Sequence, residues 1–337
     1  MLYDGMKGRW RLVFQFMLCC CSSPGPAFGW GSEGHRAIAA LAAQLISPET
    51  RAHVQKRLAE GGDTDLAAVS TWADELVEAR VGSGPLRNNP EAQLFNRQFP
   101  DNPKWHFTNL PLGLRDYSEA GGFAAANDVV HAIERCITVL ESANPVSGEI
   151  GQTQALRLLV HFVGDVHQPL HCGSGFYELR DPERPELITD PKAAFGLPND
   201  RGGNDLFYGP EKQLHAFWDV ELVERIADSP DYQVLAGYLA KTYPPEAVPL
   251  PPGHYHHWPE LWAIESVAAA NLAYAGIEFQ AAKRSVNGEL LQVTIGLPAG
   301  YEQRSKAVAA QQLARAGAHL AQLLDRIKWR CSKPEGR

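Results

Sequence analysis

Three things are scarce in this sequence of 337 residues: cysteine, basic charge and long apolar runs. Its 6 cysteines are too few for a disulfide scaffold, and no apolar run approaches the roughly 20 residues that span a bilayer. Lys and Arg number 31 against 39 Asp and Glu, so the net charge is −8. That balance argues against a protein that holds nucleic acid by covering many phosphates with basic side chains. The 45% apolar content is ordinary for a globular protein.

Residues 1–29 have the pattern of a secretory signal peptide. Three basic residues precede an apolar run over residues 12–21, prolines follow, and small residues end the segment at Ala27 and Gly29. About ten apolar residues are too few for a signal anchor. Cleavage after Gly29 would make Trp30 the N-terminus of a secreted or periplasmic chain with net charge −10, since three basic residues and one acidic residue are removed.

Cysteine use in the mature chain allows little cross-linking. Only Cys136, Cys172 and Cys331 follow the predicted cleavage point, so at most one disulfide can form and one thiol is left over. The spacing does not say which pair would form. A lipid anchor on the cysteines at positions 19–21 is the weaker alternative to cleavage after Gly29.

Apolar periodicity predicts one mainly helical domain over residues 30–337. Helical spacing occurs in six segments, which are residues 35–46, 123–142, 153–168, 212–227, 258–283 and 302–329. Ser47-Pro48-Glu49 starts a further short helix, because Ser can cap it and Pro fits its first turn. Only residues 290–295 have the composition of a strand. Residues 82–98, 173–203 and 244–258 are predicted to be loops.

Two His–Asp pairs indicate a metal site. His161 and Asp165, like His215 and Asp219, stand four residues apart, so each pair lies on one helix face. Both pairs lie in apolar sequence, and a buried carboxylate must be paired, hydrogen-bonded or bound to metal. His171 follows the first pair, just past a proline that ends the helix. Such mixed nitrogen and oxygen ligands are typical of zinc.

These pairs belong to a longer series of motifs. In chain order they are Trp30-Gly31-x₂-Gly34-His35, Thr71-Trp72-Ala73-Asp74, Trp105-His106-Phe107-Thr108-Asn109, His161-x₃-Asp165-x₅-His171, Gly202-Gly203-Asn204, His215-x₃-Asp219 and Trp262-Ala263-Ile264-Glu265-Ser266. In this series the chain resembles the secreted zinc-dependent nucleases of the S1/P1 type. That family includes fungal single-strand nucleases and plant bifunctional nucleases that also act as 3′-nucleotidases.

The resemblance implies a helical fold of the phospholipase C/nuclease type, with little β structure and three zinc ions in a cleft. By matching positions, the first zinc would take Asp74, His106, His161 and Asp165. The second would take the α-amine and carbonyl of Trp30, with His35 and a shared Asp165, and the third would take His171, His215 and Asp219. Because only a free α-amine ligates, signal cleavage would help to build the site.

The resemblance also implies a reaction. A secreted monomer would hydrolyse phosphodiester bonds of single-stranded DNA and RNA to 5′-phosphorylated products, and would dephosphorylate 3′-nucleotides. Asp74 would orient the attacking water, Phe107 would stack on a base, and Asn109 and Asn204 would contact substrate. Three zinc ions carry +6 against −3 from their aspartates, so the metals could supply the phosphate affinity that the acidic chain lacks.

Departures from the family lie near the expected cleft. Asn109 stands where Asp is frequent, and Val77 stands where some fungal members have Lys. The segment 172–201 is longer than the family leads us to expect, and we interpret it as a rim or lid over the third zinc.

Two other functions stay open. They are a tri-zinc phospholipase C, which the same ligands would serve, and a secreted zinc-binding protein without catalysis. The Gly-Gly-Asn segment, Phe107 and the segment 262–266 favour the nuclease over the lipase. The complete ligand set argues against a non-catalytic protein.

Overall fold

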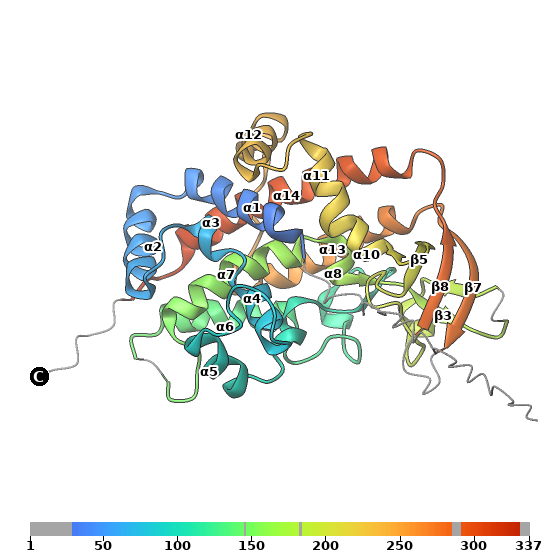
Figure 1. The fold of residues 1–337 in the computed structure, drawn as a ribbon, viewed down its shortest axis with the longest axis horizontal. Helices are drawn as coiled ribbons and strands as arrows, with labels where there is room; N and C mark the ends of the chain where they lie inside the picture. The colour runs from blue at the N-terminus through green and yellow to red at the C-terminus, as the bar shows by residue number, and fades with distance from the viewer. Residues whose placement is uncertain (1–28, 145, 182–183, 285–290, 331–337) are drawn as a thin grey trace, which may run out of the picture.

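A computed structural model describes residues 29–144, 146–181, 184–284 and 291–330, and helices dominate it as predicted (Figure 1). The longer helices are α1 (Gly31–Leu45), α2 (Pro48–Gly61), α4 (Trp72–Arg80), α5 (Pro90–Gln98), α6 (Val129–Glu141), α7 (Gln152–Val166), α12 (Tyr232–Thr242), α13 (Trp258–Tyr274) and α14 (Tyr301–Arg326). The shorter ones are α3 (Leu66–Val69), α8 (Pro169–Cys172), α9 (Pro191–Ala194), α10 (Leu214–Ala216) and α11 (Leu222–Ile226). Single turns η1 (Asn102–His106), η2 (Tyr117–Glu119), η4 (Pro245–Ala247) and η5 (Tyr255–His257) are 3₁₀, and η3 (Phe217–Glu221) is a π-helix.

Helix α7 lies at the centre of the fold. Every residue from Ala155 to Val166 is buried, because helices pack around it on several sides: α6, α2, α4, α13 and α14 all contact it. Helix α1 packs on α14 and α12 in the upper layer of Figure 1, and α6 packs on α7 in the lower one. An all-round buried helix carries its polar residues into the interior, so His161 and Asp165 need interior partners.

Short strands connect the segments that carry the site. β1 (Leu110–Pro111) pairs in parallel with β2 (Gly173–Ser174), which brings the residues after His106 beside those after His171. The backbone N–H of Thr108 accordingly donates to the His171 carbonyl at 2.8 Å. β3 (Phe176–Glu178) pairs antiparallel with β4 (Glu186–Ile188). The largest sheet has the order β6-β5-β8-β7, from β5 (Leu206–Gly209), β6 (Lys212–Gln213), β7 (Glu278–Arg284) and β8 (Leu291–Gly296).

Two of the predicted helices include residues that form a strand. The helix predicted over 258–283 ends at Tyr274, because Ala275 is extended and Gly276 has φ = 76°; residues 278–284 then pair with β8 as strand β7. The segment 212–227 begins as strand β6 and is helical only from Leu214. Strand β8 confirms the predicted strand 291–295, while residue 290 lies outside the described residues.

The predicted loops contain regular structure. Residues 90–98 of the first loop form α5, because Asn89 caps the helix through its Oδ1 and Pro90 fits the first turn. The second, 173–203, holds β2, β3, β4 and α9. The third predicted loop, 244–258, contains the 3₁₀ turns η4 and η5, and its last residue, Trp258, starts α13. The helix predicted over 123–142 starts at 129, where Asp128 accepts from two backbone N–H groups.

Some predictions concern residues that the structure does not describe. The predicted signal peptide, residues 1–29, lies outside the described part except for Gly29, and Cys331 also lies outside it. Cys136 and Cys172 are buried free thiols. In the described ranges, no helix combines the length and the hydropathy that crossing a bilayer requires.

Candidate metal centre

The nine predicted ligand residues converge in the interior from separate elements. Each is at least nine-tenths buried, and they come from the cap and first turns of α1 (Trp30, His35), α4 (Asp74), η1 (His106), α7 (His161, Asp165), α8 (His171), α10 (His215) and η3 (Asp219). The π-helix η3 contains Asp219 and directly follows α10, which carries His215, so the backbone widens where this pair faces the site. Three sets of ligand atoms are each close enough together to hold one ion: His35, Asp74 and His161; His106, His161 and Asp165; and His171, His215 and Asp219.

The first group comprises the predicted ligands of the first zinc, Asp74, His106, His161 and Asp165. His106 Nδ1 lies 3.0 Å from Asp165 Oδ2 and 3.5 Å from Asp74 Oδ1. His161 Nε2 lies 3.1 Å and 3.3 Å from the same two oxygens, and 3.2 Å from His106 Nδ1. Zinc–ligand bonds of about 2.05 Å place tetrahedral ligand atoms about 3.3 Å apart. Each histidine nitrogen therefore lies at about this distance from both carboxylates, and His106, His161 and Asp165 are close enough together to hold one ion.

The third group is as compact as the first. His215 Nε2 lies 3.2 Å from His171 Nε2 and 3.2 Å from Asp219 Oδ2. Gln168 fixes the carboxylate by donating its side-chain N–H to Asp219 Oδ1 at 2.6 Å, which turns Oδ2 toward the two imidazoles. Three protein ligands in this geometry leave a fourth position for water or substrate.

Backbone carbonyls fix which ring nitrogen each histidine presents. The Nδ1–H groups of His161, His171 and His215 donate to the carbonyls of Ser70, His106 and Gly202, at 2.7, 2.7 and 2.6 Å. Since Nδ1 carries the hydrogen, Nε2 keeps its lone pair for a metal.

Between Asp165 and His35 lies the place of the predicted second zinc. Asp165 Oδ1 lies 3.4 Å from His35 Nε2. Trp30 is fully buried and donates its indole N–H to the Gly164 carbonyl at 3.1 Å. Gly29 borders this place, because a Cβ built on it would lie 2.0 Å from Asp165 Oδ1 and 2.8 Å from His35 Nε2. The peptide that joins Gly29 to Trp30 thus starts at the predicted ion position.

Unpartnered buried atoms support metal binding at this centre. Within the described residues, both ring nitrogens of His35 and one oxygen each of Asp74, Asp165 and Asp219 are buried with no hydrogen-bond partner. Leaving such atoms unpaired is costly, and cations would satisfy the three carboxylate oxygens and one of the two His35 nitrogens. The residues present therefore fit the metal that the sequence predicts.

Shifts in the pKa values of His215, His35 and Asp219 also favour metal binding at this centre. Burial, with help from His171, lowers the pKa of His215 to about 3, and burial also lowers the pKa of His35, so both rings are neutral and able to ligate at neutral pH. Burial raises the pKa of Asp219 well above its ordinary value, because no cationic side chain compensates it. A divalent ion would supply the missing positive charge.

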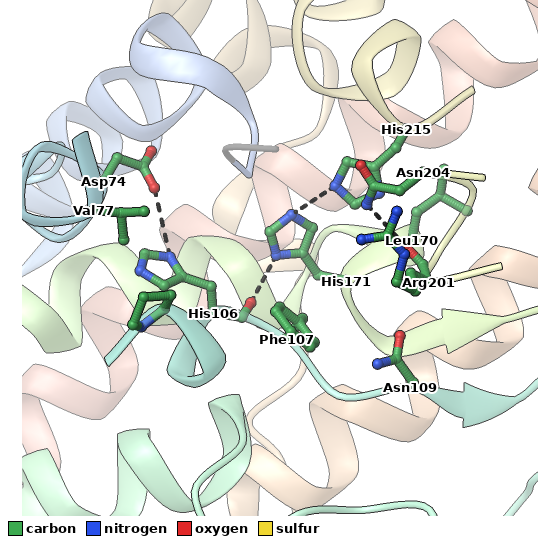
Figure 2. Close-up of a pocket in the computed structure, with 11 residues that line it drawn as sticks. Asp74, Val77, His106, Phe107, Asn109, Leu170, His171, Arg201, Asn204 and His215 are labelled. Carbon is green, nitrogen blue, oxygen red and sulfur yellow. Dashed lines mark hydrogen bonds and ion pairs between the residues drawn. The ribbon is translucent and has the colours of Figure 1, made fainter. Parts of the chain in front are cut away.

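A cleft opens onto the centre, and Figure 2 shows its lining. Its walls are formed by Asp74, Val77, Pro103, His106, Phe107, Asn109, Leu170, His171, Arg201, Asn204 and His215. Phe107 is 38% exposed, although its neighbour His106 is buried. The three predicted substrate contacts, Phe107, Asn109 and Asn204, all line this cleft, while their roles stay predictions.

A second cavity reaches the centre from the α1 side. Its lining includes Glu33, Glu75, Glu78 and Glu224, with Arg36 as the basic residue among them, and Arg36 is paired with Glu33 at 3.1 Å. Burial and the neighbouring carboxylates of Asp74 and Glu75 raise the pKa of Glu78. An acidic opening repels phosphate, so nucleic acid is expected to enter through the cleft of Figure 2.

Sequence reasoning missed several residues that shape the site. Gln168, which orients Asp219, and Arg201, which lines the cleft, were not singled out. Ser174, which contacts Asn109 at 2.9 Å, was also missed. Arg201 directly precedes the Gly-Gly-Asn motif, and that adjacency was the one signal that could have found it. The segment 172–201, interpreted as a rim, packs through β2 beside β1 and ends at Arg201 in the cleft wall.

Comparison with known proteins assigns the class. The profile of the S1/P1 Nuclease family matches residues 30–328, and the chain belongs to that family. The match begins at Trp30, the residue that the signal-peptide pattern predicts as the mature N-terminus.

Named relatives are nucleases of plants and fungi. Endonuclease 2 of Arabidopsis thaliana is 24% identical over 319 residues, covering 89% of this chain and 90% of that protein. Nuclease S1 of Aspergillus oryzae is 27% identical over 313 residues, covering 89% and 92%. Nuclease P1 of Penicillium citrinum is 28% identical over 200 residues, covering 58% of this chain and 59% of that protein.

Proposed function

We propose that the mature chain is an exported, zinc-dependent endonuclease. Its substrates are single-stranded DNA and RNA, its products carry 5′-phosphates, and it also removes the phosphate of 3′-nucleotides. The observation that carries the proposal is the convergence of three buried His/Asp groups beneath a cleft that exposes an aromatic side chain. The family membership and the nuclease names of the relatives support it.

Three zinc ions account for the buried ligand atoms. Asp74, His106, His161 and Asp165 hold the first. Asp165 Oδ1 and His35, with the α-amine and carbonyl of Trp30, hold the second. The remaining group, from α8, α10 and η3, holds the third. Because Asp165 Oδ2 faces the first group and Oδ1 faces His35, this carboxylate would contribute to holding two of the ions.

The ligand geometry suits phosphodiester hydrolysis without a protein nucleophile. When bound, the zinc ions act as Lewis acids that lower the pKa of water and neutralise charge on the phosphate and on the leaving 3′ oxygen. Asp74 is the residue that orients the attacking water: its Oδ1 belongs to the first group, and the residue also lines the cleft. The histidines serve as ligands, and none is needed as a nucleophile.

Single-strand selectivity follows from where the aromatic side chain lies. Phe107 directly follows the ligand His106, so a base stacked on its exposed ring has its phosphate near the metal groups. A base in a duplex is already stacked on its neighbours and cannot reach such a ring without leaving the helix. Single strands and short oligonucleotides are therefore the substrates.

Asn109 sets the hydrogen-bonding character of the base site. The buried Ser174 hydroxyl accepts from the Gly202 N–H at 2.9 Å, so its own hydrogen needs an acceptor, which is Asn109 Oδ1 at 2.9 Å. This contact fixes the amide orientation and leaves the Asn109 NH₂ group as the donor available to the cleft. The site therefore favours base edges that present acceptors.

Changing Asn109 to Asp should alter base preference. A carboxylate accepts where the amide donates, so guanine, which offers N1–H and N2–H, gains over cytosine, which offers N3 and O2 as acceptors. We expect the ratio of kcat/KM for guanosine 3′-phosphate over cytidine 3′-phosphate to rise about tenfold in N109D. Hydrolysis of bis(p-nitrophenyl) phosphate, which has no base, is the control. An unchanged ratio would remove Asn109 from the base site.

One purified sample tests the proposed function. We expect release of 5′-phosphorylated products from denatured DNA and from RNA, slow cleavage of duplex DNA, and phosphate release from 3′-nucleotides. Chelation should stop all of these reactions and zinc should restore them. Phosphatidylcholine is the discriminating substrate, because turnover of the lipid alone would make the chain a phospholipase C. No turnover of any substrate by zinc-loaded protein would make it a binding protein.

A further inference from the structure

Arg201 is the cation of the substrate cleft. Among the described residues that line it, Arg201 is the only Lys or Arg. In Figure 2, Asp74 and Val77 lie at one end of the cleft and Arg201 and Asn204 at the other, with His171 between them. A negatively charged strand that crosses the metal groups thus meets a single basic side chain, away from Asp74.

The backbone holds Arg201 in an unusual conformation. Its φ is 53°, and the next two glycines are also left-handed, at 61° and 80°. The Arg201 N–H donates to Asn199 Oδ1 at 2.9 Å, and the Arg201 carbonyl accepts from Asn204 Nδ2 at 2.9 Å. Left-handed non-glycine residues cost free energy and persist where the surroundings impose them, often at functional sites. This loop is therefore built to direct one side chain.

The guanidinium is oriented but keeps donors to spare. Its Nε and Nη2 contact the two oxygens of Asp205 at 3.0 and 2.6 Å, and Asp205 is buried. The Arg201 side chain itself is half exposed. Two of its five N–H groups serve Asp205, which leaves three for a ligand. A planar fork with free N–H groups is suited to a phosphate.

The Arg201 loop is tied directly to both the base site and a metal ligand. Gly202 donates its N–H to Ser174, which in turn donates to Asn109 of the base site. The Gly202 carbonyl accepts from the Nδ1–H of His215. Arg201 therefore directly precedes Gly202, whose N–H and carbonyl connect the base site at Asn109 with His215 of the third metal group.

We propose that Arg201 binds the 5′-phosphate of the nucleotide whose 3′-phosphate is cleaved. This assignment rests on the proposed function, in which the base lies on Phe107 and Asn109 and the 3′-phosphate lies on the metals. A nucleotide held in that way has one further phosphate, on its 5′ side, and Arg201 is the basic side chain beside its pocket. Asp205 is the positioning residue that orients the guanidinium.

The test compares two substrates that differ by that phosphate alone. For Arg201→Ala in the mature, metal-loaded enzyme, we expect KM for a nucleoside 3′,5′-bisphosphate to rise about tenfold, with kcat nearly unchanged. KM for the nucleoside 3′-phosphate should stay within about twofold. Arg180→Ala is the matched control, because Arg180 lies in the same segment, is 84% exposed and pairs with Glu178.

Further variants separate binding from a structural role. Arg201→Lys keeps the charge but not both contacts to Asp205, so its KM for the bisphosphate should lie between those of the wild type and Arg201→Ala. Asp205→Asn should also raise this KM, because it weakens the contacts that orient the guanidinium. A tenfold rise for both substrates would place Arg201 on the reacting phosphate instead, and no rise for either would make it only a loop brace; both results overturn the proposal. If the wild type hydrolyses neither substrate, the proposed function fails, and calorimetric affinities for the same two compounds still decide the role of Arg201.

Discussion

Replacing Asp165 with Asn will abolish hydrolysis and remove metal from the protein. Asp165 is fully buried, and its two oxygens face two different ligand groups, so a neutral amide weakens both at once. We expect activity on denatured DNA to fall by about 10³-fold or more, equivalent to about 4 kcal/mol of transition-state stabilisation. Metal analysis should find fewer than three zinc ions per chain. His161→Ala should have the same effects, because it removes a ligand of the first group.

The control for this prediction must separate metal loss from misfolding. Although burial raises the pKa of Asp165, His161 and His171 hold it well below its ordinary value in the metal-free protein, so D165N should melt below the metal-free wild type and should also lose the rise in Tm that zinc gives. Asp63→Asn is a matched carboxylate change, since Asp63 pairs with Arg157 on the same helix α7, remote from the ligands. Full activity in D165N or H161A would refute the site.

A chain that begins before Trp30 should lack one zinc ion. An added Met or a retained Gly29 converts the α-amine into an amide, which does not ligate, and Gly29 itself lies between Asp165 and His35. We expect two zinc ions instead of three, and a fall in activity of at least about 100-fold, because the ion next to Asp165 is missing. Metal analysis of chains produced with and without the extension provides the measurement.

The side chain of Trp30 can be tested apart from its amine. Trp30→Phe keeps a free N-terminus and loses the indole contact to Gly164, so it should keep three zinc ions and lose some stability. Three ions and full activity in the extended chain would contradict the role of the amine.

The helices that form the site could be predicted because local sequence determines them. The apolar run of α7 and the Ser47 cap of α2 act within a few residues, and Ser47 Oγ does accept from the Thr50 N–H. Strand β7 escaped prediction because its Ala and Lys residues are good helix formers, and only pairing with β8 makes them extended. The predicted loop 82–98 contains Asn89 and Pro90, which cap and start α5.

Within the site, motif spacing found the ligands but not what orients them. His161 with Asp165 and His215 with Asp219 are i, i+4 pairs, and His171 follows the first pair; the family resemblance supplied the other ligands. Gln168 contacts Asp219 across 51 positions, and Arg201 reaches the cleft through a left-handed loop. Such long-range contacts leave no periodic signal in the sequence.

The carbonyls that orient the histidines make the three ligand groups depend on one another. His171, of the third group, is held by the carbonyl of His106, which belongs to the first, and His161 is held by Ser70, four residues before Asp74. Displacement of one ligand segment therefore misaligns a ring in a neighbouring group. Zinc binding to the wild-type mature chain should then be cooperative, so protein loaded with one or two ions should be rare during a zinc titration.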